Sequence, residues 1–66
     1  MQITVNGQAM ELSAGQTGAG LLAELKIPPA TVVAELNAQI IKREDFLKHV
    51  LSDGDVLELV TVVGGG

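Results

Sequence analysis

Apolar and polar residues alternate at the start of the chain, which predicts two strands joined by a tight turn. Ile3 and Val5 alternate with polar neighbours over residues 2–5, the period of a strand that buries one face. Asn6-Gly7 follows, and both residues tolerate the positive φ that a type I′ hairpin turn requires. We therefore expect residues 8–12 to return as the second strand of a hairpin.

The end of the chain carries the longest strand-like segment, residues 56–63. Leu57 and Leu59 share one parity and are expected to face the core. Glu58 is charged, so the opposite parity should face solvent and place the valines of this strand outward. Exposed valines near the tail indicate contact with a partner rather than with the core. The positions that we expect to bind a partner are Glu58, Val60, Val62 and Val63.

An apolar stripe after the hairpin predicts one main helix. Its members are Leu21, Leu22 and Leu25. Thr17 is placed to cap the N-terminus of this helix. Gly18 and Gly20 fall in the first turn, where each costs up to about 1 kcal/mol relative to alanine, so that end should be weak. Pro28-Pro29 ends the helix, because proline lacks the backbone N–H and disfavours the α region in the residue before it.

The remaining segments complete an α+β pattern. Residues 31–36 are rich in β-branched side chains and predict a third strand, residues 37–39 a turn, and residues 40–41 a short fourth strand. Residues 42–50 are ambiguous, and we expect one or two irregular turns there. Residues 52–55 form a clear turn. The order predicts a mixed sheet packed on one main helix rather than a doubly wound fold.

Composition narrows the classes of function. The 66 residues include one aromatic residue and no cysteine, so neither a disulfide nor a thiol nucleophile is available. Four basic against eight acidic residues give a net charge of −4, which disfavours a nucleic-acid partner. No apolar stretch approaches the ~20 residues that span a bilayer. With no secretory signal visible, we expect a cytoplasmic chain that is a monomer in isolation.

Candidate catalytic and metal-binding groups are sparse. His49 has no serine, cysteine or second ligand to work with, so a surface or packing role is the simpler interpretation. Asp53-Gly54-Asp55 lacks the remaining ligands of a calcium loop and predicts a plain turn. Glu44-Asp45 beside Lys42-Arg43 indicates a solvated turn, although the two basic residues could also contact acidic groups of a partner. We therefore expect no catalytic residue, metal site or bound cofactor in this chain.

The three glycines Gly64-Gly65-Gly66 follow the apolar last strand without a polar linker. Glycine runs are weak signals, and composition alone leaves a frayed or incidental terminus open. A reactive terminal carboxylate would nevertheless benefit from glycine, because a tail without Cβ atoms can enter a narrow active site of another protein. Adenylation would give that carboxylate a good leaving group, and a sulfur nucleophile could then form a thioacid.

Taken together, the order and spacing of these segments resemble the ThiS family of sulfur carriers over essentially the whole chain. The matching segments are Ile3-x-Val5-Asn6-Gly7, Ala14-Gly15-Gln16-Thr17 with Leu21-Leu22, Glu35-Leu36-Asn37 with Ile40-Ile41, Asp53-Gly54-Asp55, and Val63-Gly64-Gly65-Gly66. Three positions depart from the family pattern: Gly18 replaces an aliphatic residue and so removes a core contact, Lys42 stands where a proline is frequent, and Phe46 replaces a frequent tryptophan.

The resemblance implies a ubiquitin-like β-grasp domain over residues 1–63 and a flexible glycine tail over residues 64–66. It implies that Gly66 is the carrier residue and Gly65 its required neighbour. A ThiF-type enzyme would use ATP to adenylate Gly66, a sulfur donor such as a cysteine desulfurase would supply the sulfur of the thiocarboxylate, and the thiazole synthase ThiG would receive it.

Two alternatives remain at this point. The chain could be a related carrier, the MoaD-like small subunit of molybdopterin synthase, which docks on a large synthase subunit. It could also be a non-carrier β-grasp module that binds a partner through its sheet, with the glycines incidental. Residues appended after Gly66 would be tolerated by such a module and would block a carrier.

Overall fold

The computed structural model describes residues 1–62 of the chain. Val63 and the glycines Gly64, Gly65 and Gly66, with the partner-contact, carrier and flexible-tail predictions made for them, lie outside the described residues. The elements are β1 (Gln2–Val5), β2 (Gln8–Glu11), α1 (Gly18–Glu24), a 3₁₀ turn (Pro29–Thr31), β3 (Val32–Leu36), β4 (Gln39–Ile41), α2 (Arg43–Lys48) and β5 (Val56–Thr61).

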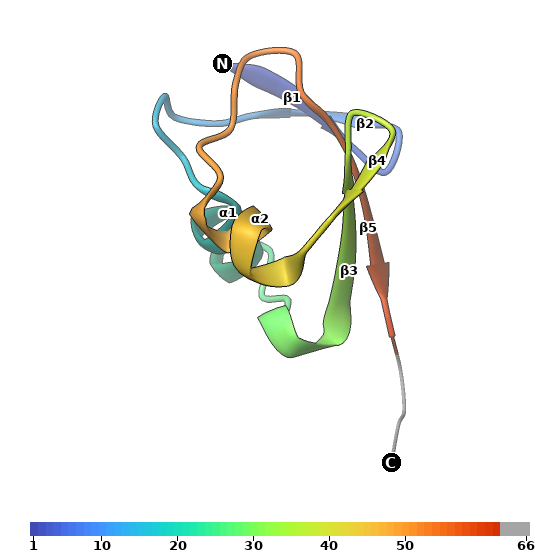
Figure 1. Ribbon diagram of the computed structural model, residues 1–66. Coiled ribbons are helices and arrows are strands. Elements are labelled where there is room, and N and C mark those ends of the chain that lie inside the picture. The colour runs from blue at the N-terminus through green and yellow to red at the C-terminus, as the bar shows by residue number, and fades with distance from the viewer. Residues whose placement is uncertain (63–66) are drawn as a thin grey trace.

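The five strands form one mixed sheet in the order β2-β1-β5-β3-β4. β5 lies at its centre, parallel to β1 and antiparallel to β3. Figure 1 shows both helices on the same side of this sheet. The predicted α+β architecture is confirmed, because a mixed sheet covered on one side by a main helix is the β-grasp arrangement.

The first hairpin forms as predicted. Asn6 and Gly7 have φ values of 50° and 83°, and Val5 lies opposite Gln8, so the turn has two residues. Positive φ at both central positions suits the right-handed twist of the flanking strands. The side chain of Asn6 also reaches β5, where its Oδ1 accepts a hydrogen bond from the Leu59 N–H at 2.7 Å. The turn therefore ties the hairpin to the central strand.

The core is aliphatic and lies between the sheet and the helices. Leu57 is fully buried and Leu59 is nearly so, which confirms the predicted inward parity of the last strand. The fully buried large side chains are Ile3, Leu21, Leu22, Phe46 and Leu57. Side chains of this size each gain about 1.5–3 kcal/mol from burial, so a few of them supply much of the stability of a short chain.

The main helix begins as predicted, since Thr17 Oγ1 accepts a hydrogen bond from the Gly20 N–H at 3.1 Å. The interpretation of Gly18 as a lost core contact is wrong. Gly18 is buried, and a Cβ there would collide with the Phe46 carbonyl oxygen and lie 2.9 Å from the carbonyl carbon. The absence of a side chain lets α1 approach α2 closely, so glycine here serves packing.

The second half of the chain is more regular than expected. Instead of irregular turns, residues 43–48 form the helix α2, which buries Phe46 against α1. Glu44 and Asp45 in its first turn and Lys48 in its last turn each interact favourably with the helix dipole. Three boundaries also differ. Thr31 closes the 3₁₀ turn instead of opening β3, and Gln39 begins β4 instead of belonging to the turn. β5 ends at Thr61, so Val62 lies beyond the strand that was expected to include it.

Candidate functional site

The outer face of the sheet, opposite the helices, carries the predicted partner-binding residues that the structure describes. Glu58, Val60 and Val62 are exposed, and the last two have 60% and 56% of their surface accessible. Glu58 and Val60 share the parity opposite to the buried Leu57 and Leu59. Their placement therefore follows the predicted alternation.

Neighbouring strands extend this face with residues that the sequence analysis did not select. Val33 of β3 lies opposite Val60, and Glu35 of β3 lies opposite Glu58. Ile40 of β4 lies opposite Glu35 and is 78% exposed. We call Val33, Glu35, Ile40, Glu58 and Val60 the outer patch. Only the register between strands distant in sequence brings these five residues together.

The end of β5 is held firmly up to the last described residue. Thr61 lies opposite Val32, and the Val62 N–H donates to the Thr31 carbonyl oxygen at 2.6 Å. The central strand thus carries the chain past the rim of the sheet toward residue 63 (Figure 1).

Arg43 anchors the turn to which Val62 is bonded. Its Nε donates to the Pro29 carbonyl oxygen at 2.7 Å, and its Nη2 donates to the carbonyl oxygens of Ala30 and Val32 at 3.3 and 3.4 Å. The planar guanidinium can serve several acceptors at once. Arg43 is exposed, as expected, but it begins α2 instead of lying in a turn, and it links α2 to the 3₁₀ turn beside the end of β5.

Asp55 anchors the opposite end of β5 and is 8% exposed. Its carboxylate accepts hydrogen bonds from the Ser52 N–H at 2.9 Å and from Asn37 Nδ2 at 3.1 Å, and lies 3.3 Å from His49 Nε2. Burial alone would raise the pKa of Asp55, but the bonds from Ser52, Asn37 and His49 outweigh it and lower the pKa. The Asp55 carboxylate therefore stabilises the fold through specific hydrogen bonds, which the interpretation of a plain turn did not include.

Asn37 completes this anchor. Its backbone N–H donates to the Val56 carbonyl oxygen at 2.8 Å, and its Oδ1 accepts from the Val56 N–H at 2.9 Å. The turn between β3 and β4 is thereby fixed to the start of β5. The sequence signal for this role was weak, since an asparagine in a turn is ordinarily explained by its tolerance of positive φ, here 51°.

Neither end of β5 provides catalytic machinery. His49 pairs with Asp55, and the neighbouring Ser52 contributes its backbone N–H to the same carboxylate, so the described contacts of this cluster are those of a packed structural group. Within residues 1–62, no group of three potential metal ligands comes together. No helix in this part of the chain is long and apolar enough to cross a membrane.

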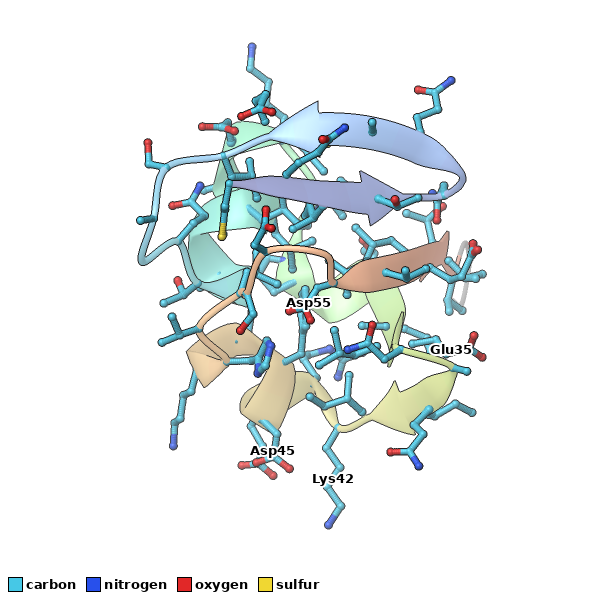
Figure 2. The ribbon with its side chains drawn as sticks, turned by 90° about the horizontal axis from the view of Figure 1, so that it is seen from above. Glu35, Lys42, Asp45 and Asp55 are labelled. Atoms are coloured by element: carbon cyan, nitrogen blue, oxygen red, sulfur yellow. The ribbon has the colours of Figure 1, made fainter. Side chains whose placement is uncertain are left out.

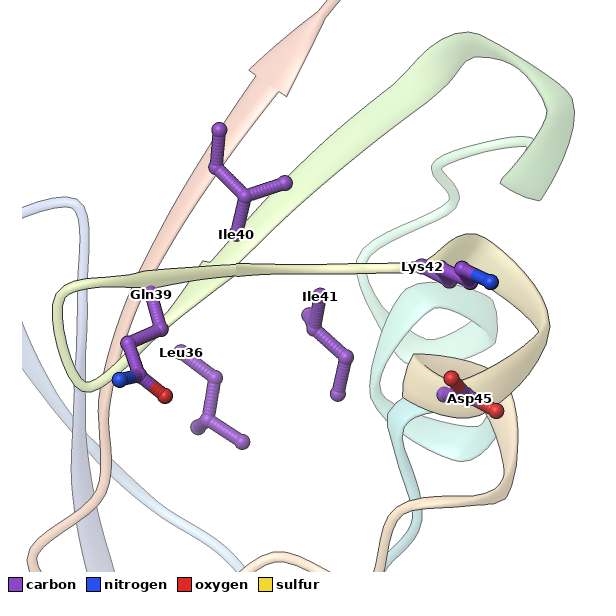
Figure 3. Close-up of a pocket in the computed structure, with 6 residues that line it drawn as sticks. All are labelled: Leu36, Gln39, Ile40, Ile41, Lys42 and Asp45. Atoms are coloured by element: carbon purple, nitrogen blue, oxygen red, sulfur yellow. The ribbon is translucent and has the colours of Figure 1, made fainter.

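A pocket of about 260 Å³ lies between the edge strand β4 and α2 (Figure 3). In this view Leu36 and Ile41 point to one face of the sheet, the face that the helices cover, whereas Ile40 points to the opposite face. Lys42 and Asp45 supply its charged groups. Its other lining residues are Leu36, Gln39, Ile40 and Ile41, so the pocket is mainly apolar with charged groups at its helix end.

Comparison with known proteins places this arrangement in a family. The ThiS family model matches residues 3–66. The sulfur carrier protein ThiS of Escherichia coli K12 is 42% identical over 66 residues, with both chains covered completely. The crystal structure of a thiamine biosynthesis protein, ThiS from Geobacter metallireducens, superimposes with a TM-score of 0.79 at 36% identity, again covering 100% of both chains.

A different kind of relative is a longer protein that contains a segment similar to this chain. The thiazole synthase of Paramagnetospirillum magneticum is 35% identical over 66 residues, which span 20% of that longer protein. The thiazole synthase of Magnetococcus marinus matches in the same way, with 36% identity over 20% of its length. On the family match through residue 66, the end-to-end similarity to ThiS proteins and the shared fold, this chain belongs to the ThiS family.

Proposed function

We propose that this chain is a sulfur carrier of thiazole biosynthesis and that the α-carboxylate of Gly66 is the group that carries sulfur. The observation that supports this most is the family match, which extends through Gly66 and covers both this chain and E. coli ThiS completely. The protein is a co-substrate and not an enzyme in this role. Its contribution is to present the carboxylate on a slender tail behind a fixed strand.

The proposed chemistry takes place on partners. In the active site of a ThiF-type enzyme, a carboxylate oxygen of Gly66 attacks the α-phosphorus of ATP, and pyrophosphate leaves. The terminal sulfur of a persulfide, formed on a donor such as a cysteine desulfurase, then attacks the acyl carbon, AMP leaves, and an acyl disulfide joins Gly66 to the donor. A second thiol attacks the donor's own sulfur, the S–S bond breaks, and the thiocarboxylate leaves on Gly66, so that sulfur takes the place of oxygen while the two thiols are oxidised to a disulfide. We expect that this chain binds no cofactor itself, because the activating enzyme binds the ATP, and that the reaction takes place in the cytoplasm.

The partner surface in this proposal includes Glu58 and Val60 of β5, together with Val62 and Val63 that follow this strand in the sequence. Gly64 and Gly65 form the slender part of the tail, where a side chain would hinder entry into a channel. ThiG-type thiazole synthase is the proposed acceptor of the sulfur. Relatives named for thiamine and thiazole favour this pathway over the molybdopterin alternative.

Intact mass spectrometry tests the proposal. After incubation with a ThiF-type enzyme, ATP and a sulfur source, we expect the mass increase of one oxygen replaced by sulfur at the C-terminus. Two variants serve as controls, one lacking Gly66 and one with alanine appended after it, and both should remain unmodified while folding normally. A wild-type chain that stays unmodified with a competent enzyme, or an appended chain that functions uncut, contradicts the proposal.

A further inference from the structure

Two carboxylates face each other at the centre of the outer patch. Glu35 and Glu58 are directly opposed on the antiparallel strands β3 and β5. Residues in such positions have Cβ atoms about 4.5–5.5 Å apart, and like charges there destabilise the sheet. Figure 2 shows Glu35 pointing away from the helices, toward the solvent side of the sheet.

Among residues 1–62, no ion pair balances these two carboxylates. All the basic side chains belong to or adjoin the helices, and they are Lys26, Lys42, Arg43 and Lys48. Arg43 is engaged with backbone carbonyls. The ion pairs among residues 1–62 join the N-terminal amine to Glu11 and His49 to Asp55, and neither includes Glu35 or Glu58. The sheet therefore keeps a repulsive pair that the isolated chain does not compensate.

Apolar side chains flank the two carboxylates. Val33 and Val60 oppose each other one row away on the same face, and Ile40 lies beside Glu35 on β4. Of these, Ile40 is 78% exposed. A protein that covers these apolar groups must also remove water from Glu35 and Glu58, which is strongly unfavourable unless the partner supplies a positive charge.

The chemistry of the patch selects its partner. An arginine fits best, because its planar guanidinium offers several N–H donors and can bridge two carboxylates. A second copy of this chain fits badly, since face-to-face pairing of outer patches would bring four carboxylates together. Among the relatives, two thiazole synthases carry a similar module within their own chains, so the synthase is the partner with which such a face would be combined.

We infer that the outer patch docks on thiazole synthase, with an arginine of the synthase placed between Glu35 and Glu58 and apolar groups against Val33, Ile40 and Val60. This inference rests on the proposed function and adds the chemistry by which the carrier is recognised. The surface that binds is thus distinct from the tail that reacts.

Titration of this chain with purified ThiG-type thiazole synthase tests the inference. The double variant E35Q/E58Q should raise Kd about thirtyfold, the change that corresponds to about 2 kcal/mol for removing a desolvated charge pair. The matched control E24Q/E44Q changes the net charge equally on the exposed surface of the two helices. Its Kd should stay within about twofold of wild type, because distant exposed charges contribute little.

The unfolding temperature of the free chain and the salt dependence of binding distinguish an effect on binding from an effect on folding. In the free chain, E35Q/E58Q should unfold at a temperature equal to or above that of wild type, since the substitution removes a repulsion. Wild-type binding should weaken with added salt more steeply than binding of the variant. A loss of binding with unchanged or improved stability supports the inference.

Four outcomes overturn the inference. The first two are an equal Kd for E35Q/E58Q and wild type, and an equal loss of affinity for E35Q/E58Q and E24Q/E44Q. The third is a loss of affinity by E35Q/E58Q that appears with the ThiF-type enzyme alone, and the fourth is a wild-type chain that becomes thiocarboxylated yet does not bind the synthase. In the last case the proposed function stands. A wild-type chain that neither accepts sulfur nor binds the synthase refutes the proposed function itself.

Discussion

Removing the Asp55 carboxylate should cost a large part of the stability of this domain. Asp55→Ala deletes the acceptor of the Ser52 N–H and of Asn37 Nδ2, and it leaves His49 without its partner. Hydrogen bonds to charged groups contribute about 1.5–3 kcal/mol each when buried, and these donors can partly recover by bonding water. Counting the Ser52 bond in full and the others in part gives a loss of about 3 kcal/mol.

That loss is decisive for a chain of this length. A domain of 66 residues has a free energy of unfolding of about 3–10 kcal/mol. Asp55→Asn keeps the shape and one acceptor oxygen, so its loss should be intermediate. Glu24→Ala is the matched control, because Glu24 is an exposed carboxylate on α1. Its free energy of unfolding should change by less than about 0.5 kcal/mol.

Urea unfolding followed by far-ultraviolet circular dichroism measures these differences, since the chain has no tryptophan or tyrosine for fluorescence. The midpoint should fall in the order wild type, Asp55→Asn, Asp55→Ala, with an unchanged slope. Because the folded-state pKa of Asp55 lies below its ordinary value of 3.8, its stabilising contribution is present above that pH. The contribution should be lost as the pH falls through the folded-state pKa.

The dependence of stability on pH in acid tests this reasoning. Asp55→Asn has no carboxylate at this position, so its stability should fall less steeply than that of wild type as the pH is lowered from about 5 to 2. If the two curves run parallel in acid, or if Asp55→Ala unfolds at the same urea concentration as Glu24→Ala, the carboxylate does not anchor β5 and the reasoning fails.

Two further substitutions probe the contacts of α2. Arg43→Ala should lower the free energy of unfolding by about 1–2 kcal/mol, because bonds to three carbonyls are lost at an exposed site. In thermal melts, Arg43→Lys should recover only part of this lost stability. Full recovery by lysine would refute the need for a guanidinium. Gly18→Ala should cost about 1–3 kcal/mol through its collision with the Phe46 backbone. Gly20→Ala, whose Cβ meets the movable Gln16 side chain, should be neutral or stabilising in the same assay, and the reverse order of the two variants would contradict the packing described for α1.

Local patterns in the sequence were sufficient for several elements. The Asn6-Gly7 turn, the Thr17 cap and the inward parity of Leu57 and Leu59 all follow from chemistry within a few residues. The terminal glycines were not sufficient in this way, because a glycine run alone left an incidental terminus open and the resemblance to the ThiS family was needed to assign the carrier role. Fold class followed from the order of these elements together with the family resemblance.

Other features depend on which distant segments meet. Whether residues 42–50 form a helix was ambiguous locally and is decided by the burial of Phe46 against α1. Gly18 could be understood only once the Phe46 backbone lay beside it. Asp55 likewise resembled an ordinary turn residue until Asn37 and His49 were placed around it.

The outer patch shows the same division most clearly. The sequence by itself determined that Glu58 and Val60 face outward, because alternation along one strand needs no information from elsewhere. Only the tertiary structure decided that Glu35 stands directly across from Glu58. A shift of one residue in the pairing of β3 with β5 would separate the two carboxylates, and register between distant strands is set by the packing of the whole core.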